Sequence, residues 1–405
     1  MDSFDAIMPF SAEELTRLRA ETPGCVERVH LNNAGAGLMP APVLRAITGH
    51  LELESRIGGY EAADAREAGI EDAYAPVASL LGCAPRNVAM VENATVAFQQ
   101  ALSAIPFERS DVILTSVNDY ISNQLMFLSL AKRFGIEIVR APEAAEGGID
   151  VDAAARLIRE RRPRLVSLTH VPTNSGLVQP VAAVGRICRE HGIWYLVDAC
   201  QSAGQLPLDV NAIGCDFLSA TSRKFLRGPR GAGFLYASDR ALAAGLEPLF
   251  PDMRGARWKE ADGYEAAPTA RRFENWEFAY ALVLGTGAAA RYALEIGIDR
   301  IAERSTALAA QLRELLAAAG LPVLDRGVQR CAIVTVAIPG HDAESFVTEL
   351  QRRGINANIS RREYAVIDFA QKGVDWALRL SPHYYNTEDE LRRAVAAIVE
   401  IARPR

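Results

Sequence analysis

Lys224 stands in surroundings that suggest covalent chemistry. It follows the apolar run Phe217–Ala220 and precedes a stiff turn rich in glycine, with two hydroxyl side chains, Thr221 and Ser222, and the cation of Arg223 beside it. Hydroxyls and a guanidinium suit a phosphate anion. A buried lysine among cations has a lowered pKa and supplies the nucleophilic amine that Schiff-base chemistry needs. The other lysines stand in polar contexts and are predicted to be surface residues: Lys132, Lys259 and Lys372.

An acid ends another apolar run upstream of this lysine. Asp198 follows Leu196 and Val197, and it stands 224 − 198 = 26 residues before Lys224. A carboxylate at the end of a strand can pair with a pyridinium nitrogen and keep the ring an electron sink. The alternative is an acid that caps the next helix. The presence of Lys224 at a similar place favours the ring partner.

Short apolar runs alternate with amphipathic helical segments between about residues 85 and 240, and this alternation predicts an α/β domain with a mainly parallel sheet. Ligands of such sheets bind beyond the carboxyl ends of the strands, so we expect the site residues where these runs end. The helical segments include Val181–His191. The predicted strands are Val88–Val91, Val112–Thr115, Ile136–Val139, Leu165–Leu168, Trp194–Val197, Phe217–Ala220 and Gly233–Tyr236.

The pattern of helical and strand-like segments changes after about residue 285, and the new pattern predicts a smaller α+β domain. We therefore expect an N-terminal segment, 1–40, packed beside the small domain and the pocket, a large domain, 41–285, and a small domain, 286–405. The elements predicted for the last part are helices at 287–296 and 300–319, a strand at Ala332–Ile338, and helices at Ala343–Arg353 and Glu388–Ala402.

The composition excludes several classes of protein. The net charge of the 405 residues is −6 and the basic residues form no stripe, which argues against a nucleic-acid partner. No run reaches the ~18 apolar residues of a membrane span, and the first residues lack the pattern of a signal peptide. The six cysteines and six histidines are dispersed without metal-ligand spacing. We expect a cytoplasmic protein that binds no membrane and no metal.

Several motifs in order resemble the class V aminotransferase group of pyridoxal-phosphate (PLP) enzymes of fold-type I. They are Asp-x-x-Gln at Asp198–Gln201, Lys-x-x-x-Gly-Pro-x-Gly-x-Gly at Lys224–Gly233, and the outer segments His30–Gly35 and Arg379–Thr387. The group includes cysteine desulfurases, kynureninase, isopenicillin N epimerase and carbon–sulfur lyases. The resemblance implies a PLP cofactor, a large domain with a seven-stranded sheet, and a homodimer.

The same resemblance implies roles for single residues. Lys224 would form the Schiff base and Asp198 would face the ring nitrogen. Tyr120 would stack on the ring, and Gln201 would approach its phenolic oxygen or the phosphate. Thr173 and Asn174 both fall at the loop that contacts the phenolic oxygen, and either could make that contact. The residues implied to hold the phosphate are Ala94, Thr95, Thr221 and Arg223, and those implied to meet the substrate are Asn33 and Arg379.

Two departures from the group affect the expected reaction. Desulfurases carry a nucleophilic cysteine shortly before the position of Arg379, but Gly354–Asp375 contains none, and Cys331 is predicted to be a buried structural thiol in a strand. Where many relatives place Gly-Thr to bind the partner subunit's phosphate, this chain has Asn275-Trp276. We therefore expect no persulfide-forming desulfurase activity.

The remaining reactions begin with loss of the Cα proton. Gly58-Gly59-Tyr60 and the Ser222-Arg223-Lys224 motif resemble hercynylcysteine sulfoxide lyases, and Asn174-Ser175-Gly176 resembles cystine lyases. These features favour β-elimination from a cysteine S-conjugate or sulfoxide. Transamination and epimerisation are the alternative reactions, and a catalytically silent binding module is the alternative class. Specificity is expected in the loops Asp252–Thr269 and Ser360–Asp375.

Overall fold

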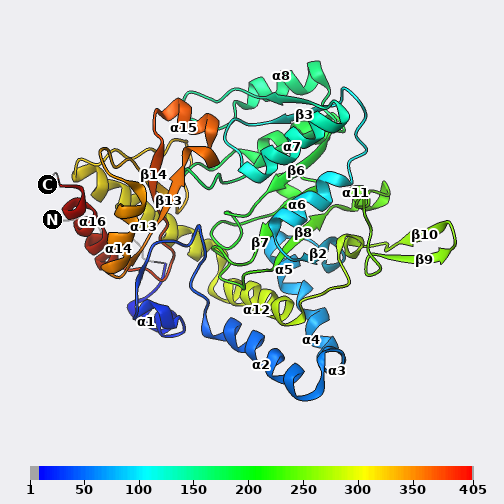
Figure 1. Ribbon diagram of the computed structural model, residues 1–405, viewed down its shortest axis with the longest axis horizontal. Helices are drawn as coiled ribbons and strands as arrows, with labels where there is room; N and C mark the ends of the chain where they lie inside the picture. The colour runs from blue at the N-terminus through cyan, green and yellow to red at the C-terminus, as the bar shows by residue number, and fades with distance from the viewer. Residues whose placement is uncertain (1–8, 404–405) are drawn as a thin grey trace.

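The computed structural model describes residues 9–403. The larger part of the chain is built around a seven-stranded sheet (Figure 1). Its strand order is β2-β8-β7-β6-β5-β3-β4, in which β8 is antiparallel to both neighbours and the other pairs are parallel. The predicted, mainly parallel sheet is confirmed. Its strands are β2 (Val88–Val91), β3 (Val112–Thr115), β4 (Glu137–Arg140), β5 (Leu165–Thr169), β6 (Trp194–Asp198), β7 (Phe217–Thr221) and β8 (Gly233–Ala237).

Helices cover the two faces of this sheet, and their ends follow local chemistry. Asn93 and Asp150 accept hydrogen bonds from the first turns of the helices that follow them, and Gly135 ends a helix in the left-handed conformation that glycine adopts at no steric cost. The helices of this part are α2 (Ala41–Ile57), α3 (Gly59–Ala65), α4 (Glu67–Asp72), α5 (Tyr74–Leu81), α6 (Ala94–Ser103), α7 (Ile121–Phe134), α8 (Val151–Arg161), α9 (Val181–Glu190), α10 (Val210–Ile213), α11 (Asp239–Ala243) and α12 (Tyr280–Ile296).

The C-terminal part builds a second, smaller core. An antiparallel sheet of order β11-β14-β13 packs with helices around Leu312, Leu350 and Leu378, which are fully buried. The last helix begins at Thr387, whose hydroxyl and the Glu390 carboxylate form a capping box. The elements are α13 (Ile298–Ala318), β11 (Val334–Val336), α14 (Ala343–Arg352), β13 (Asn358–Arg361), α15 (Val366–Lys372), β14 (Trp376–Leu380) and α16 (Glu388–Ala402).

The N-terminal segment lies against this smaller part. Helix α1 (Ala12–Ala20) leads to strand β1 (Val29–His30), which pairs in parallel with β12 (Ile355–Asn356). Residues 1–8 of the predicted segment lie outside the described residues. The predicted boundary between 285 and 286 falls inside α12, a continuous helix. The division into three parts stays a prediction.

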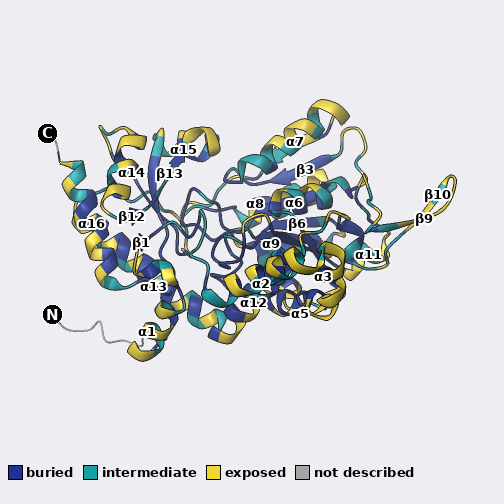
Figure 2. Cartoon of the chain, turned by 60° about the horizontal axis from the view of Figure 1, so that its bottom comes forward, coloured by how far each residue is buried: buried dark blue, intermediate teal, exposed yellow. Residues whose placement is uncertain are grey.

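The two segments expected as loops contain regular structure. A hairpin of β9 (Ala256–Glu260) and β10 (Gly263–Ala266) projects from the body, with Trp258 79% exposed (Figures 1 and 2). The second segment contains a turn of 3-10 helix at Arg362–Tyr364 followed by α15. Among the described residues no single helix is long and apolar enough to cross a bilayer, and only the bent pair α12 and α13 together passes that test.

Candidate active site

The predicted site residues meet at the carboxyl ends of the strands. Asp198 is the last residue of β6 and Thr221 the last of β7, and Lys224 follows in the next loop. They enclose a cavity of about 420 Å³. Its lining consists of Asn93, Ala94, Thr95, Val96, Tyr120, Asn123, Asp198, Cys200, Thr221, Arg223 and Lys224.

The lysine loop is buried and shaped by its own backbone. The Ser222 hydroxyl is directed at the carbonyls of Pro229 (2.6 Å) and Ala232 (3.0 Å), so it stabilises the turn instead of facing a ligand. Burial lowers the pKa of Lys224, and the cation of Arg223 acts in the same direction, whereas Asp198 raises it. The amine is therefore closer to its neutral, nucleophilic form than a surface lysine.

Arg227 ties the lysine loop to distant parts of the chain. It has a positive φ of 62°, which a residue with a Cβ adopts only where its surroundings hold it. Its guanidinium donates to the carbonyl of Leu38 (2.7 Å), to the hydroxyl of Thr22 (2.6 Å) and to the hydroxyl of Tyr384. The lysine loop is thus hydrogen-bonded to residues from both the N-terminal and the C-terminal parts of the chain.

Asp198 is buried and held by two donors. Its Oδ2 accepts from Asn123 Nδ2 at 3.1 Å and its Oδ1 from the backbone N–H of Cys200 at 2.9 Å. Asn123 and Cys200 both line the cavity, yet the sequence prediction of site residues included neither. The spacing of Asn123, four residues after Asp119 and so on the first turn of α7, is the signal that could have found it.

The start of α6 forms one wall of the cavity. Asn93 caps the helix by accepting from Val96 N, while the preceding N–H groups of Ala94 and Thr95 belong to the first turn, where a helix offers donors to an anion. Gly233 lets β8 approach, since a Cβ there would lie 3.0 Å from Ala94 N. Arg223 reaches the same cavity, and its guanidinium donates to the carbonyl of Gly35.

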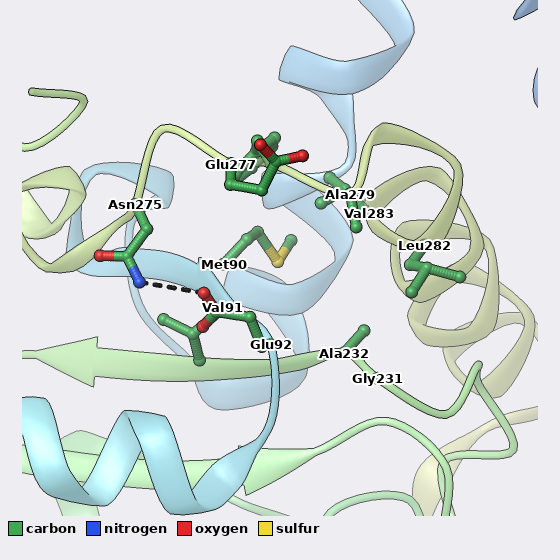
Figure 3. Close-up of a pocket in the computed structure, with 11 residues that line it drawn as sticks. Met90, Val91, Glu92, Gly231, Ala232, Asn275, Glu277, Ala279, Leu282 and Val283 are labelled. Carbon is green, nitrogen blue, oxygen red and sulfur yellow. Dashed lines mark hydrogen bonds between the residues drawn. The ribbon is translucent and has the colours of Figure 1, made fainter. Parts of the chain in front are cut away.

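A much smaller cavity lies behind this wall, next to the Asn275–Glu277 segment. Its volume of about 20 Å³ has room for about one water molecule, so it holds no substrate (Figure 3). Asn275 Nδ2 donates to Glu92 Oε1 at 2.9 Å across it. In this chain, Asn275 therefore bonds to its own subunit, beside the start of α6.

A second group of predicted residues converges on Thr173. Arg379, on β14, donates to the Thr173 carbonyl (3.0 Å) and hydroxyl (2.6 Å), and Gln201 Nε2 donates to the same hydroxyl at 2.8 Å. Arg379 Nε and Gln201 Oε1 are buried without a partner, and unpaired buried polar atoms are costly unless a ligand meets them. Burial lowers the pKa of Arg379 to about 10, which leaves it protonated at neutral pH.

Asn174 faces away from this group. Its Nδ2 donates to Asp368 Oδ2 on α15 at 2.7 Å, and Asp368 also accepts from Asn118 and Lys372. Of the two loop residues, Thr173 is therefore the one that touches Arg379 and Gln201. The prediction of a surface position for Lys372 is wrong, because its side chain is only 8% exposed and its ammonium pairs with Asp368 at 2.8 Å.

Asn33 connects the N-terminal segment to the strand that carries Arg379. Its Nδ2 donates to the Ser381 carbonyl at 2.8 Å and its Oδ1 accepts from the Tyr385 hydroxyl at 2.5 Å. Both ends of the amide thus have protein partners, and the expected contact of Asn33 with substrate stays a prediction. Within the described part of the chain, no group of His, Cys, Asp and Glu side chains is placed to hold a metal ion.

A buried lysine and a buried acid at the ends of neighbouring strands of this sheet define a PLP enzyme of fold-type I. The family model described as aminotransferase class-V matches residues 29–394, and the chain belongs to that family. It is 28% identical over 95% of its length to a probable cysteine desulfurase of Methanothermobacter thermautotrophicus, which is covered to 97%.

Other relatives carry different names. A probable hercynylcysteine sulfoxide lyase of Mycobacterium tuberculosis is 29% identical, with 95% of this chain and 92% of that protein covered. The fold is similar to that of C-DES, a cystine C–S lyase that was solved with glycine linked to its PLP cofactor, with a TM-score of 0.84, 23% identity, and 94% and 99% of the two chains covered. The predicted family, fold and cofactor are confirmed.

The residues present fit PLP. A cavity of about 420 Å³ offers an amine at Lys224, a carboxylate at Asp198, a ring at Tyr120, and donors at the start of α6 beside Arg223. The ammonium of Lys224 lies 5.9 Å from the centroid of the Tyr120 ring. When bound, PLP supplies an electron sink for the negative charge that develops at the substrate's Cα.

Proposed function

We propose that this PLP enzyme cleaves the carbon–sulfur bond of a cysteine S-conjugate or sulfoxide by β-elimination. The Cα–H and Cβ–S bonds break, the sulfur group leaves with the bonding pair and takes up a proton, and water replaces the amino group. The products are a sulfur compound, pyruvate and ammonia. The two alternatives are transamination and epimerisation, which begin with loss of the same Cα proton.

The segment before Arg379 carries this proposal. Gly354–Asp375 is where the resemblance places the nucleophilic cysteine of desulfurases, but here it has none and contains α15, whose Asp368 is bonded to Asn118 and Asn174. Cys331 is fully buried, and burial raises the pKa of its thiol to about 12. A thiol in that state is no sulfur acceptor at neutral pH.

The relatives supply independent support. A hercynylcysteine sulfoxide lyase and a cystine C–S lyase are among the similar proteins, although many others are named cysteine desulfurases. The motif differences identified in the sequence separate this chain from the latter group. They do not by themselves exclude an aminotransferase, which the experiment below distinguishes.

Each polar residue of the site has a role in this reaction. Lys224 carries the amine that exchanges with the substrate and moves the Cα proton. Asp198 keeps a proton at the ring nitrogen. Arg379 orients the substrate's carboxylate with two parallel N–H groups, which sets the direction of the Cα–H bond. The partnerless Arg379 Nε is the atom that such a carboxylate would satisfy.

A homodimer is part of the proposal. The hairpin of β9 and β10 extends away from the body (Figure 2). Large apolar side chains on it and in the neighbouring segments are exposed. An isolated two-stranded hairpin is only marginally stable in water, so a partner surface would stabilise it. The exposed residues are Leu249, Phe250, Met253, Trp258, Tyr264 and Trp276.

The test offers the PLP-loaded enzyme a panel of cysteine S-conjugates, cysteine sulfoxides and ordinary amino acids, with and without keto acids. We expect pyruvate and ammonia in equal amounts from a sulfur-containing substrate without any keto acid. Lys224→Ala should abolish turnover, by at least about 10⁴-fold, because proton transfer and amine exchange both need this amine.

Other results identify the alternatives. Conversion of the cofactor to its amine form, with turnover restored only by a keto acid, would establish transamination and overturn the proposal. Inversion of the substrate's Cα without pyruvate would establish epimerisation. A Lys224→Ala variant that still releases pyruvate would contradict the assignment of the lysine.

A further inference from the structure

A buried chain of polar side chains runs from Asp198 through Asn123, which lines the cavity, to Asp119, which does not. Asn123 donates from one nitrogen to two carboxylates, to Asp198 Oδ2 and to Asp119 Oδ1, each at 3.1 Å. Asp119 is 6% exposed and Asn123 is 2% exposed. Asp119 is not among the residues that line the cavity.

The orientation of the Asn123 amide follows from these partners. An amide NH₂ has two hydrogens, and here two carboxylate oxygens lie within reach of them. The opposite orientation would set the amide oxygen against both carboxylates. Asn123 therefore bridges the two acids with its donors, and a change at one acid is transmitted to the other through a single rigid group.

Asp119 is built as a carboxylate that accepts only. Its Oδ1 accepts from Tyr120 N at 2.7 Å and from the Thr169 hydroxyl, and its Oδ2 accepts from Gln124 Nε2 at 2.9 Å and the Thr115 hydroxyl at 3.2 Å. With Asn123, five donors surround two oxygens. Burial raises the pKa of Asp119, whereas the hydrogen bonds from Thr169, Gln124 and Asn123 lower it and favour the form that accepts from all of them.

We propose that Asp119 is a positioning residue that, through Asn123, holds the Asp198 carboxylate in its orientation toward the ring nitrogen of PLP. The N–H of Cys200 donates to Asp198 Oδ1, and Asn123 donates to Oδ2, so the loss of Asn123 would leave Oδ2 less firmly held. The inference rests on the proposed role of Asp198. It does not depend on which amino acid is the substrate.

A hydrogen bond from the backbone also links Asp119 to Tyr120, whose ring is proposed to stack on the cofactor. Asp119 Oδ1 accepts from the N–H of Tyr120, the residue whose ring lines the cavity. Asp119 therefore supports two of the groups that line the cavity, Asp198 through Asn123 and Tyr120 directly. The loss of its carboxylate should loosen both.

The test measures the cofactor in the absence of substrate, so its failure is separate from failure of the proposed reaction. Asp119→Asn should raise the PLP dissociation constant about tenfold and change the visible absorption of the bound cofactor in the same direction as Asp198→Asn, but by less. The conservative variant Asp119→Glu should restore part of the affinity. In turnover, kcat should fall with little change in KM.

A matched control removes a buried carboxylate at the amino end of β7, away from the carboxyl ends that carry the site. Asp216 precedes β7, is 4% exposed, and accepts from Tyr195 N at 3.0 Å and from the Ser238 hydroxyl at 3.2 Å. Asp216→Asn should lower thermal stability without changing the absorption of bound PLP. If both variants changed the absorption equally, the effect of Asp119 would be general destabilisation and the inference would be wrong.

A double-variant cycle tests the route through Asn123. In an Asn123→Ala background, Asp119→Asn should cost less PLP affinity than it does in the parent, because only the contact with Tyr120 N remains to be lost, whereas fully additive losses would contradict the inference. If Asp119→Asn does not fold, Thr115→Val decides the matter, because it removes one donor to Asp119 and touches neither Asn123 nor the cavity. A small loss of PLP affinity would support the inference, and unchanged affinity would overturn it.

Discussion

The two sides of the active site are built differently. On the cofactor side, Asp198, Thr221 and Lys224 come from adjacent strand ends of one sheet, and neutral donors hold the acid. On the side proposed to meet the substrate, Arg379 belongs to the small sheet and contacts the Thr173 loop from 206 residues away. The first side uses local order within one sheet, and the second depends on how two parts of the chain fit together.

The first side holds the lysine and the acid that PLP enzymes of this family use. The second side holds the segment that we expect to decide which reaction follows. The lysine and the acid lie within the part of the chain that the family model matches, and both are buried. The missing cysteine of desulfurases belongs to the other side, where Gly354–Asp375 contains none and α15 is bonded through Asp368. Variants on the two sides should therefore have separable effects on cofactor binding and on turnover.

The largest effect on the substrate side is expected for Arg379→Lys. An ammonium cannot reproduce the two parallel N–H groups of a guanidinium, so kcat/KM should fall by about 100-fold, mainly through a higher KM. The absorption of bound PLP should stay unchanged, which steady-state kinetics and a spectrum on the same sample will show. Loss of PLP from this variant would mean that the two sides are not separable.

A smaller effect is expected for Asp368→Asn. The variant weakens the contacts of α15 with Asn118 and Asn174, so the Thr173 loop should be held less firmly and KM should rise about tenfold. Limited proteolysis should also cut the segment 354–375 more readily than in the parent enzyme.

The matched control lies in the same segment. The Asp375 side chain is 88% exposed and pairs with Arg362 at 3.3 Å on the surface. Asp375→Asn should therefore leave KM and the proteolysis pattern unchanged, since exposed ion pairs contribute little. An equal rise of KM in both variants would remove the special role of Asp368.

The smallest effect on activity is expected for Cys331→Ala. The thiol is fully buried in the small core, away from the cavity, so turnover should stay within about twofold of the parent while the free energy of unfolding falls by roughly 1 kcal/mol. Assays of pyruvate release and denaturant unfolding measure the two quantities. A large loss of turnover would revive a sulfur-transfer role for this cysteine.

The same comparison explains what the sequence could predict. The seven strands were predicted to within one residue at each end, because buried parallel strands are short apolar runs bounded by polar ones. Asp198 and Lys224 followed from their positions after such runs. On this side of the site, local pattern and function coincide.

The sequence pattern could not predict contacts between residues that lie far apart in the chain. Lys372 was predicted at the surface because its neighbours are polar, but the fold buries it beside Asp368. The amide of Asn174 donates to Asp368 on α15, 194 residues away. Thr173, the other candidate, is the residue that Arg379 contacts. Asn123 was left out of the predicted site residues, although it follows Asp119 by four residues, because its contact with Asp198 across 75 residues depends on the fold.

The bonds of Arg227 have a consequence for how the enzyme is made. The loop that carries Lys224 is completed only when Thr22, Leu38 and Tyr384 are all in place, and these contacts span 205, 189 and 157 residues. During synthesis the sheet can form long before Tyr384 leaves the ribosome, since contacts of such separation form late. We therefore expect the lysine loop of a nascent chain to stay incomplete until Tyr384 has emerged.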